Sequence, residues 1–223
     1  MRYPALAVAG VMVVTLGLCA PAVRAGGPDD VTIAELKKNG AAKIEGGFLT
    51  EVGFVKGTNP EPLLPLVKTA SRLRAIQFGG TKITDAGLAP IAAMAQLEYV
   101  GLINTAVGDR GLSWLTGLKK LTALNVAESR VTDAGLVHVA AIAQLEELNL
   151  RNDAISDAGL AHLVNSTRIT GLNLTGTKIT DAGLLSLQKM RRLTKLTLTN
   201  TAVTDAGVKR AKSFMPFFSK IYR

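Results

Sequence analysis

Residues 121–142 have the sequence LTALNVAESRVTDAGLVHVAAI, and the same pattern returns along the chain at a fixed distance. The pattern is marked by the motif Thr/Ser-Asp-Ala-Gly, whose aspartates recur at one constant interval or at twice that interval. Where the interval is doubled, a variant of the motif at residues 108–111 lies halfway. The interval is about 24 residues, and a fixed period of this size indicates a solenoid, in which each repeat buries its apolar side only against its neighbours. The sequence therefore predicts one elongated repeat domain.

Each repeat has two halves. Over residues 121–126 apolar side chains alternate with other residues, which places them on one face of a short strand. Over residues 136–142 the apolar residues fall three apart, which forms one stripe of a short helix that packs back onto the strands. The predicted fold class is therefore an α/β solenoid of about eight rungs, with parallel strands on one side and short helices on the other.

The residues around each aspartate are interpreted as a structural turn. The Ser or Thr before the aspartate suits a helix N-cap, and the aspartate lies where the helix dipole favours negative charge. The glycine two residues later is expected to allow close backbone approach between adjacent turns. The predicted turn residues are Asp85, Gly87, Asp109, Gly111, Asp133, Gly135, Asp157, Gly159, Asp181, Gly183, Asp205 and Gly207.

A polar column, one residue per repeat, is expected to form a second regular feature. Its members are Thr81, Thr105, Ser129, Asp153, Thr177 and Thr201. The hydroxyls of this column are expected to hydrogen-bond the backbone of the neighbouring turn and so satisfy buried polar groups. Asp153 departs from the hydroxyl pattern, and Ser166 stands where other repeats carry a large apolar residue. The rung at residues 145–168 is therefore the predicted weak point.

The full unit, L-x-x-L-x-L-x-x-T-x-I-T-D-A-G-L, resembles the leucine-rich repeat family, and more narrowly its GALA-type and F-box-associated subclass, which is also common in exported bacterial proteins. The resemblance covers about residues 49–214 with six successive matches. It implies a right-handed horseshoe or arc, with the sheet on the concave side and the helices on the convex side. Some members of the subclass are substrate-recognition arms of ubiquitin ligases. That role is not carried over, because the segment before the repeats has no room for an F-box.

The two ends predict the domain organisation. Residues 1–25 have the features of a signal peptide, with Arg2 before an apolar stretch and Val23-Arg24-Ala25 at the cleavage site. We expect cleavage after Ala25 and export to the periplasm or the exterior; the alternative is a membrane tether formed by an uncleaved signal. Residues 26–48 are expected to form an N-terminal cap of one short helix and a cap strand. Residues 215–223 are expected to form an aromatic C-terminal cap, with a last strand whose register slips by one.

Composition and motifs disfavour chemistry. Cleavage would leave 24 basic and 17 acidic residues, a net charge of +7, and would remove the only cysteine, which excludes disulfides and thiolate sites. His138 and His162 occupy one helix position without a nearby acidic ligand, so they form an incomplete zinc site. No phosphate-binding loop, nucleophile elbow or zinc-protease helix is present in the sequence. We expect a monomeric, non-enzymatic protein without cofactor or metal, and without a stable membrane span once the signal is removed.

The concave face is the predicted binding surface. Side chains that alternate with the buried ones form a regular grid along the sheet, which suits contact with a protein or peptide. Tyr99 and Ile103 are expected to be exposed there and to anchor the partner. The candidate site residues are Tyr99, Ile103, Asn125, Glu147, Asn149, Arg151 and Asn173. The asparagines allow a second interpretation, in which they form a solvated, strand-compatible ladder.

Positive charge near the C-terminus offers an alternative function. The cations are Lys189, Arg191, Arg192, Lys195, Lys209, Arg210, Lys212, Lys220 and Arg223. Such a patch could bind an anionic envelope surface or polymer. Nucleic acid is a poorer candidate, because few aromatic residues interleave with these charges.

Overall fold

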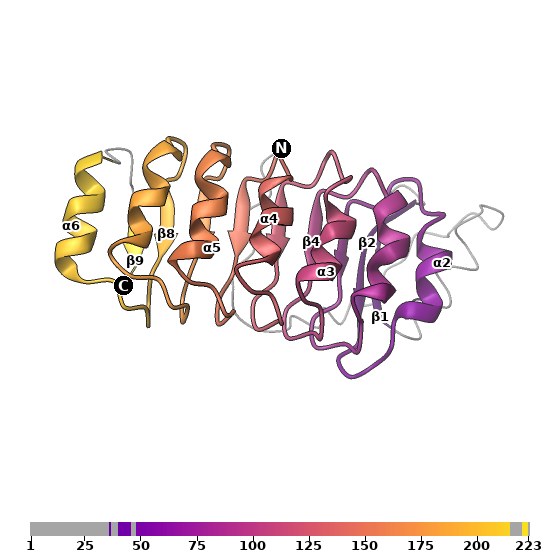
Figure 1. Ribbon diagram of the computed structural model, residues 1–223. Coiled ribbons are helices and arrows are strands. Elements are labelled where there is room, and N and C mark those ends of the chain that lie inside the picture. Colours follow the sequence, from indigo (N-terminus) through magenta and orange to yellow (C-terminus); the bar gives the residue numbers. More distant parts are fainter. Residues whose placement is uncertain (1–35, 37–39, 46–47, 215–219, 223) are drawn as a thin grey trace.

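The computed structural model describes residues 36, 40–45, 48–214 and 220–222. These residues form an elongated array with short helices along one side and a continuous sheet behind them (Figure 1). The sheet has nine strands in the order β1 to β9, the same as their order in the chain. The architecture is the predicted leucine-rich-repeat solenoid.

Seven strands repeat at the sequence period. They are β2 (Phe48–Phe54), β3 (Ala75–Gln77), β4 (Tyr99–Gly101), β5 (Ala123–Asn125), β6 (Glu147–Asn149), β7 (Gly171–Asn173) and β8 (Lys195–Thr197). Neighbours pair in parallel at an offset of one repeat, as in Ala75 beside Tyr99 and Leu124 beside Leu148. Because every rung has the same length, equivalent residues form straight columns across the sheet.

The ends depart from this register. Strand β1 (Gly40–Glu45) pairs antiparallel with β2, in the position expected for a cap strand. Strand β9 (Lys220–Tyr222) pairs parallel with β8, and Lys195 lies beside Lys220, so the expected slip of one residue is observed. The predicted signal peptide, nearly all of the N-terminal helix and residues 215–219 of the predicted C-terminal cap lie outside the described residues.

The helices are short because each rung must close within one repeat length. They are η1 (Glu61–Leu63), α2 (Leu64–Val67), η2 (Ala86–Ala93), α3 (Asp109–Leu112), η3 (Ser113–Leu115), α4 (Gly135–Ala140), α5 (Asp157–His162), η4 (Leu163–Asn165), η5 (Gly183–Lys189) and α6 (Asp205–Phe214). Within the described chain, none of them is long and apolar enough to cross a lipid bilayer.

One apolar core runs the length of the described solenoid, from Leu36 to Ala211. The middle residue of each short strand points into it, as Leu148 does, and the helix stripe closes it from the other side. Near the N-terminal end Phe54 and Phe78 stack with ring centroids 5.3 Å apart. Continuous burial of this kind supplies the stability that single repeats lack.

The polar column behaves differently from the prediction. The hydroxyl of Thr105 donates to the carbonyl of Leu102 at 2.8 Å, and the hydroxyl of Thr177 donates to that of Leu174 at 2.6 Å. These bonds stay within one turn, so the predicted bonds to the neighbouring turn's backbone are wrong for these threonines. The reason is proximity, since the carbonyl three residues back lies within the same turn whereas the next strand lies about 4.8 Å away.

A further column follows each strand and was not identified from the sequence. Its backbone has positive φ, the left-handed conformation that glycine and asparagine adopt at least cost. The members are Gly80, Asn104, Glu128, Asn152, Gly176 and Asn200, with φ between 52° and 70°. This conformation produces the sharp turn at the end of each strand, and Glu128 is the one member that is neither glycine nor asparagine.

Candidate functional site

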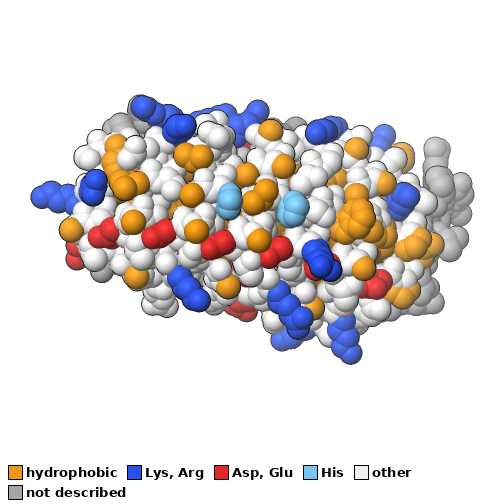
Figure 2. Space-filling view, in the orientation of Figure 1, with side chains coloured by type: hydrophobic (Ala, Val, Ile, Leu, Met, Phe, Trp, Pro, Cys, Tyr) orange, Lys and Arg blue, Asp and Glu red, His pale blue; other side chains and the backbone are white. Residues whose placement is uncertain are grey.

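A row of acidic side chains crosses the helix-bearing face of the solenoid (Figure 2). In the middle of the row, Asp109 accepts a hydrogen bond from the backbone N–H of Thr132 at 2.8 Å and another from the Thr132 hydroxyl at 2.7 Å. The same pair of bonds joins Asp133 to Ser156, Asp157 to Thr180 and Asp181 to Thr204. Each of these carboxylates therefore ties its own rung to the next one.

We call this pair of hydrogen bonds from one rung to the carboxylate of the preceding rung a joint. The joint corrects the predicted role of the glycines. The hydroxyl of Ser156 does accept from the N–H of Ala158 at 3.3 Å, as an N-cap should. The glycine two residues after each aspartate, however, makes room chiefly for the carboxylate of the preceding rung rather than for backbone. A Cβ on Gly111 would lie 2.6 Å from the Asp85 carboxylate. A side chain there would displace the acid that joins the two rungs.

Glu61 extends the joint into the atypical proline-containing rung. Its carboxylate accepts from the N–H of Thr84 at 3.2 Å and from the Thr84 hydroxyl at 2.8 Å. This role of Glu61 was not predicted from the sequence. Its place one repeat before Asp85 was the available signal. The acidic row is thus an architectural device, in which carboxylates are engaged with the backbone and the hydroxyl of the following rung.

Metal chemistry has little basis in the described residues. No cluster of three or more potential metal-ligating side chains occurs among them. The two histidines lie on neighbouring rungs, as the sequence predicted: His138 in α4 and His162 in α5. The observed fold is a repeat scaffold of the kind that typically serves as a binding module rather than an enzyme.

The asparagines of the concave face take part in turns. The side-chain oxygens of Asn125, Asn149 and Asn173 each accept the N–H two residues further on, at 3.2, 3.1 and 3.0 Å. These bonds are Asx turns, which hold the chain as it leaves each strand. Asn149 is only 8% exposed, and its amide nitrogen has no hydrogen-bond partner among the described residues. A structural role therefore accounts for the side-chain oxygens of all three asparagines.

Tyr99 and Ile103 are half-buried, whereas exposure was expected from the sequence. The ring of Tyr99 lies along its own strand across Gly101, which has no side chain to block it. Burial raises the pKa of Tyr99, and a hydrogen bond with the Asn125 side chain opposes that rise. Tyr99 is therefore held in place by residues of two strands and remains partly exposed.

The charged candidates are paired. Arg151 forms an ion pair with Glu128 of the preceding rung. Glu147 lies across Gly171 of the next strand, and one of its oxygens accepts from the Thr170 hydroxyl at 3.1 Å. The concave face thus carries charged side chains that are held by neighbouring residues, and they lie next to glycines of the strands.

Asp153 is an acidic side chain buried between two rungs. It is 3% exposed, and one oxygen accepts from the N–H of Ser129 at 2.8 Å and from the Ser129 hydroxyl at 3.2 Å. Its other oxygen has no partner among the described residues. Burial raises the pKa of Asp153 to about 7, the two bonds from Ser129 oppose the rise, and the charge of Glu128 adds to it. Asp153, the residue that departs from the hydroxyl pattern, is thus a member of the polar column whose side chain bonds the neighbouring turn's backbone.

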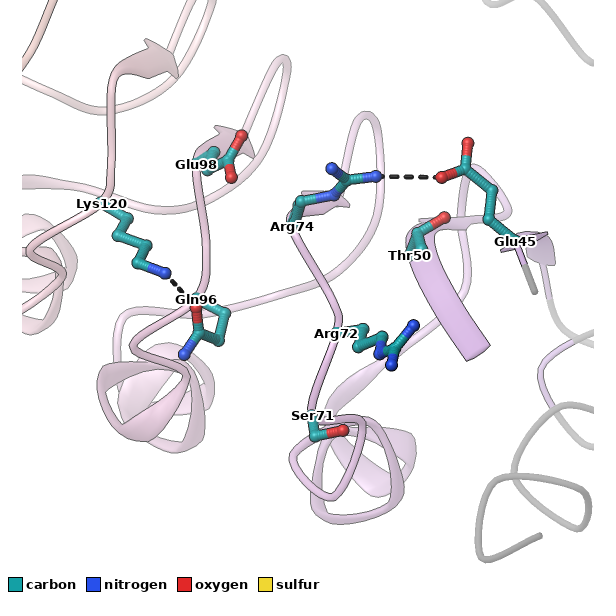
Figure 3. Close-up of a pocket in the computed structure, with 8 residues that line it drawn as sticks. All are labelled: Glu45, Thr50, Ser71, Arg72, Arg74, Gln96, Glu98 and Lys120. Carbon is teal, nitrogen blue, oxygen red and sulfur yellow. Dashed lines mark hydrogen bonds and ion pairs between the residues drawn. The ribbon is translucent and has the colours of Figure 1, made fainter. Parts of the chain in front are cut away.

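A hollow of about 310 Å³ opens at the edge where the strands begin (Figure 3). Its charged side chains are Glu45, Arg72, Arg74, Glu98 and Lys120. Arg74 pairs with Glu45 at 3.0 Å, and Lys120 donates to Gln96. The guanidinium of Arg72 lies 3.7 Å from the ring centre of Phe48. Positive and negative side chains nearly balance around the hollow, which leaves it little net potential for a charged ligand.

The basic region near the C-terminus is a surface feature. Its described cations are exposed: Lys189, Arg191, Arg192, Lys195, Lys209, Arg210 and Lys212. Over residues 183–214 the sequence contains a single acid, Asp205. Positive potential therefore concentrates around η5, β8 and α6.

The fold is similar to those of solved internalins. An internalin (inlF) from Listeria monocytogenes aligns with a TM-score of 0.62 and 23% identity, over 78% of this chain and 47% of that one, so this chain spans about half its length. Internalin C2 (inlC2) from the same organism aligns with a TM-score of 0.58 and 19% identity, over 78% of this chain and 76% of that one. A profile of the Leucine Rich repeat family matches residues 165–187. No match was found among curated proteins.

Proposed function

We propose that this chain is an exported recognition module that binds a protein or peptide on its concave face. The observation that carries the proposal is the register of the sheet, in which equivalent side chains of β3 to β8 stand in straight columns at a spacing of about 4.8 Å. A regular, rigid surface needs little ordering when a partner docks, so less of the contact energy is lost. The proposal includes two further points: that the repeats are of the GALA type, and that the protein is exported.

Tyr99 and Ile103 are the proposed anchors. Tyr99 is already fixed by Gly101 and Asn125, so a partner that covers it immobilises no further side chain. Aromatic side chains in such positions are common centres of binding energy. Around them, the amide nitrogen of Asn173 and the Glu128–Arg151 pair supply polar contacts.

The test is a comparative capture from envelope extract and culture fluid, quantified by mass spectrometry. The double variant Tyr99→Ala/Ile103→Ala is compared with Trp114→Ala, which alters an exposed aromatic residue on the helix-bearing side. We expect at least one enriched protein to be lost tenfold or more with the double variant and retained with Trp114→Ala. Equal enrichment of every captured protein by both variants would remove the concave face as the binding surface.

A second candidate is a basic surface that binds an anionic envelope polymer through residues 183–214. The seven exposed cations against one acid favour it. Binding of the protein to anionic vesicles should then weaken steeply as the salt concentration rises from about 50 to about 200 mM. The reason is that salt screens exposed charges that lie further apart than a Debye length of about 8 to 10 Å. Salt-independent binding would contradict this candidate.

A further inference from the structure

The turns that follow the strands alternate with a period of two rungs. Successive turns have the sequences Gly-Thr-Lys (80–82), Asn-Thr-Ala (104–106), Glu-Ser-Arg (128–130), Asn-Asp-Ala (152–154), Gly-Thr-Lys (176–178) and Asn-Thr-Ala (200–202). We name these six turns the turn row. The third residue is a cation in every second turn, and the first residue is an asparagine in each of the turns between them. The true period of this surface is therefore two repeats, although the core requires only one.

The backbone holds the row at a fixed spacing. Lys82, Arg130 and Lys178 each donate their N–H to a carbonyl of the preceding rung, at 2.8, 2.9 and 2.8 Å. Arg130 and Lys178 also form isolated parallel bridges with residues of the rung before. The cations are consequently about 10 Å apart, twice the strand spacing of about 4.8 Å.

The side chains of the row are accessible. Lys82, Arg130 and Lys178 are exposed, and so are Asn104 and Asn152. None of these five side chains has a hydrogen-bond or ion-pair partner within the described part of the chain. The only acid at the start of a turn in the row, Glu128, is already paired with Arg151. Alanines separate the cations along the row and leave their charges unobstructed.

Three classes of partner fit this row poorly. The exposed large apolar side chains of the described chain are Val55, Leu66, Trp114, Val137, Leu185 and Tyr222, and none belongs to it, which disfavours a protein contact or a bilayer. The row also contains no aromatic residue on which a base could stack, which disfavours single-stranded nucleic acid. A hydrophilic polymer with widely and evenly spaced charge remains.

We infer that the turn row binds a linear acidic polysaccharide in which a negatively charged sugar alternates with a neutral one. An extended pyranose advances a glycan chain by nearly the length of one strand spacing, so such a disaccharide matches two rungs. The charged groups then meet Lys82, Arg130 and Lys178, while the hydroxyl or amide groups of the neutral sugars meet Asn104 and Asn152. An asparagine amide suits the second role because it both donates and accepts. This surface and this ligand class are separate from the proposed concave-face function.

The first measurement compares two oligosaccharides of equal length by calorimetry at low salt. One alternates glucuronate with N-acetylglucosamine over eight sugars, and the other is an oligogalacturonate with a carboxylate on every sugar. We expect the alternating chain to bind at least fivefold more tightly although it carries half the charge. Tighter binding of the oligogalacturonate, equal binding of a single-stranded oligonucleotide, or no binding to either sugar chain at millimolar concentration would each overturn the inference.

The second measurement breaks the spacing at constant charge. The variant Ala106→Lys/Lys178→Ala keeps three cations in the row but places them on consecutive rungs. We expect about a tenfold loss of affinity for the alternating oligosaccharide. Unchanged affinity would show that net charge alone governs binding and would overturn the inference.

Two further variants separate the components. Asn104→Gly/Asn152→Gly removes the amides while keeping a residue that the column already uses at Gly80 and Gly176, so the fold should be retained and affinity should fall about threefold. Arg191→Gln/Arg192→Gln removes two C-terminal cations and should leave affinity within twofold of the parent. If the arginine variant loses binding and the asparagine variant does not, the C-terminal region is the site and the turn row is excluded.

Discussion

Two joints between neighbouring rungs use the same chemistry in different surroundings. On the helix-bearing face, Asp133 accepts hydrogen bonds from the N–H and the hydroxyl of Ser156, and the pair remains partly in contact with water. In the interior, Asp153 accepts from the N–H and the hydroxyl of Ser129 and is 3% exposed. Both joints have the same donors, and in the buried one burial raises the pKa of the Asp153 carboxyl to about 7.

Burial, rather than a different hydrogen-bond partner, raises the cost of the joint at Asp153, because it removes water from the charged carboxylate. The exposed joint is repeated from rung to rung, which a structure tolerates when each acid stays hydrated. The buried joint occurs once in the described chain, and its second oxygen has no partner there. The strength of this buried joint therefore depends on pH near neutrality.

The largest effect on the free energy of unfolding should come from the apolar core that all the rungs share. Leu148→Ala, in the rung of Asp153, is expected to cost about 2 to 5 kcal/mol in the free energy of unfolding, because it leaves a cavity in the continuous core. Asn149→Ala beside it should cost only about 1 kcal/mol, the loss of one turn hydrogen bond. Urea unfolding of the two variants measures this difference. Equal costs would mean that the inner and outer faces of the strand are misassigned.

The second largest effect concerns how the stability contributed by the buried joint at Asp153 depends on pH. The native pKa of Asp153 is about 7, against an ordinary value of 3.8, so between these values the folded state binds more protons than the unfolded state. The contribution of Asp153 to stability should therefore be complete below about pH 4 and should be lost as the pH rises to about 7, by at most ~4 kcal/mol. Urea unfolding at intervals of one pH unit measures the slope.

Asp153→Asn supplies the control for that slope. The variant keeps the shape and the acceptor for Ser129 but cannot ionise, so the fall in stability between pH 4 and 7 should largely disappear. If the parent and the variant show the same pH profile, other groups titrate in this range and the comparison of the two joints fails. Asp153→Thr, which restores the residue of most other rungs, should likewise remove the slope.

The smallest effect tests the exposed joint through its glycine. All three atoms nearest to a Cβ placed on Gly207 belong to Asp181, so Gly207→Ala should displace that carboxylate and cost about 1 to 3 kcal/mol. In an Asp181→Ala background the same change should stabilise the protein by up to ~1 kcal/mol, because alanine is the better residue within helix α6. A double-mutant cycle measures the coupling. A cost of the same size in both backgrounds would show that the glycine is needed for another reason.

Much of the fold followed from spacing. The alternation around Leu124 and Leu148 predicted the inner face of the strands, and the irregular C-terminal segment predicted a strand shifted by one residue. Spacing alone did not reveal the partner of each aspartate, because the acid and its Thr or Ser lie 23 residues apart and meet only when the rungs stack. Glu61 was missed for the same reason, since its longer side chain reaches the position that aspartate occupies elsewhere.

The candidate site was predictable in outline only. The columns of the concave face were predicted from the period of two, but the burial of Tyr99 depends on the absence of a side chain at Gly101 and on the nearby Asn125. Likewise, the asparagines bond within their own turns, which depends on backbone angles rather than on residue order.

The amino-acid sequence by itself determined the repeat length, the inner and outer faces and the positions of the turns, because those depend on local periodicity and on the conformational preferences of glycine, asparagine and apolar residues. Only the tertiary structure decided which carboxylates are braced at the surface and which one is buried. Stacking sets the distance between groups that lie one repeat apart in the chain and the water that reaches them, and these two quantities control both hydrogen bonding and charge.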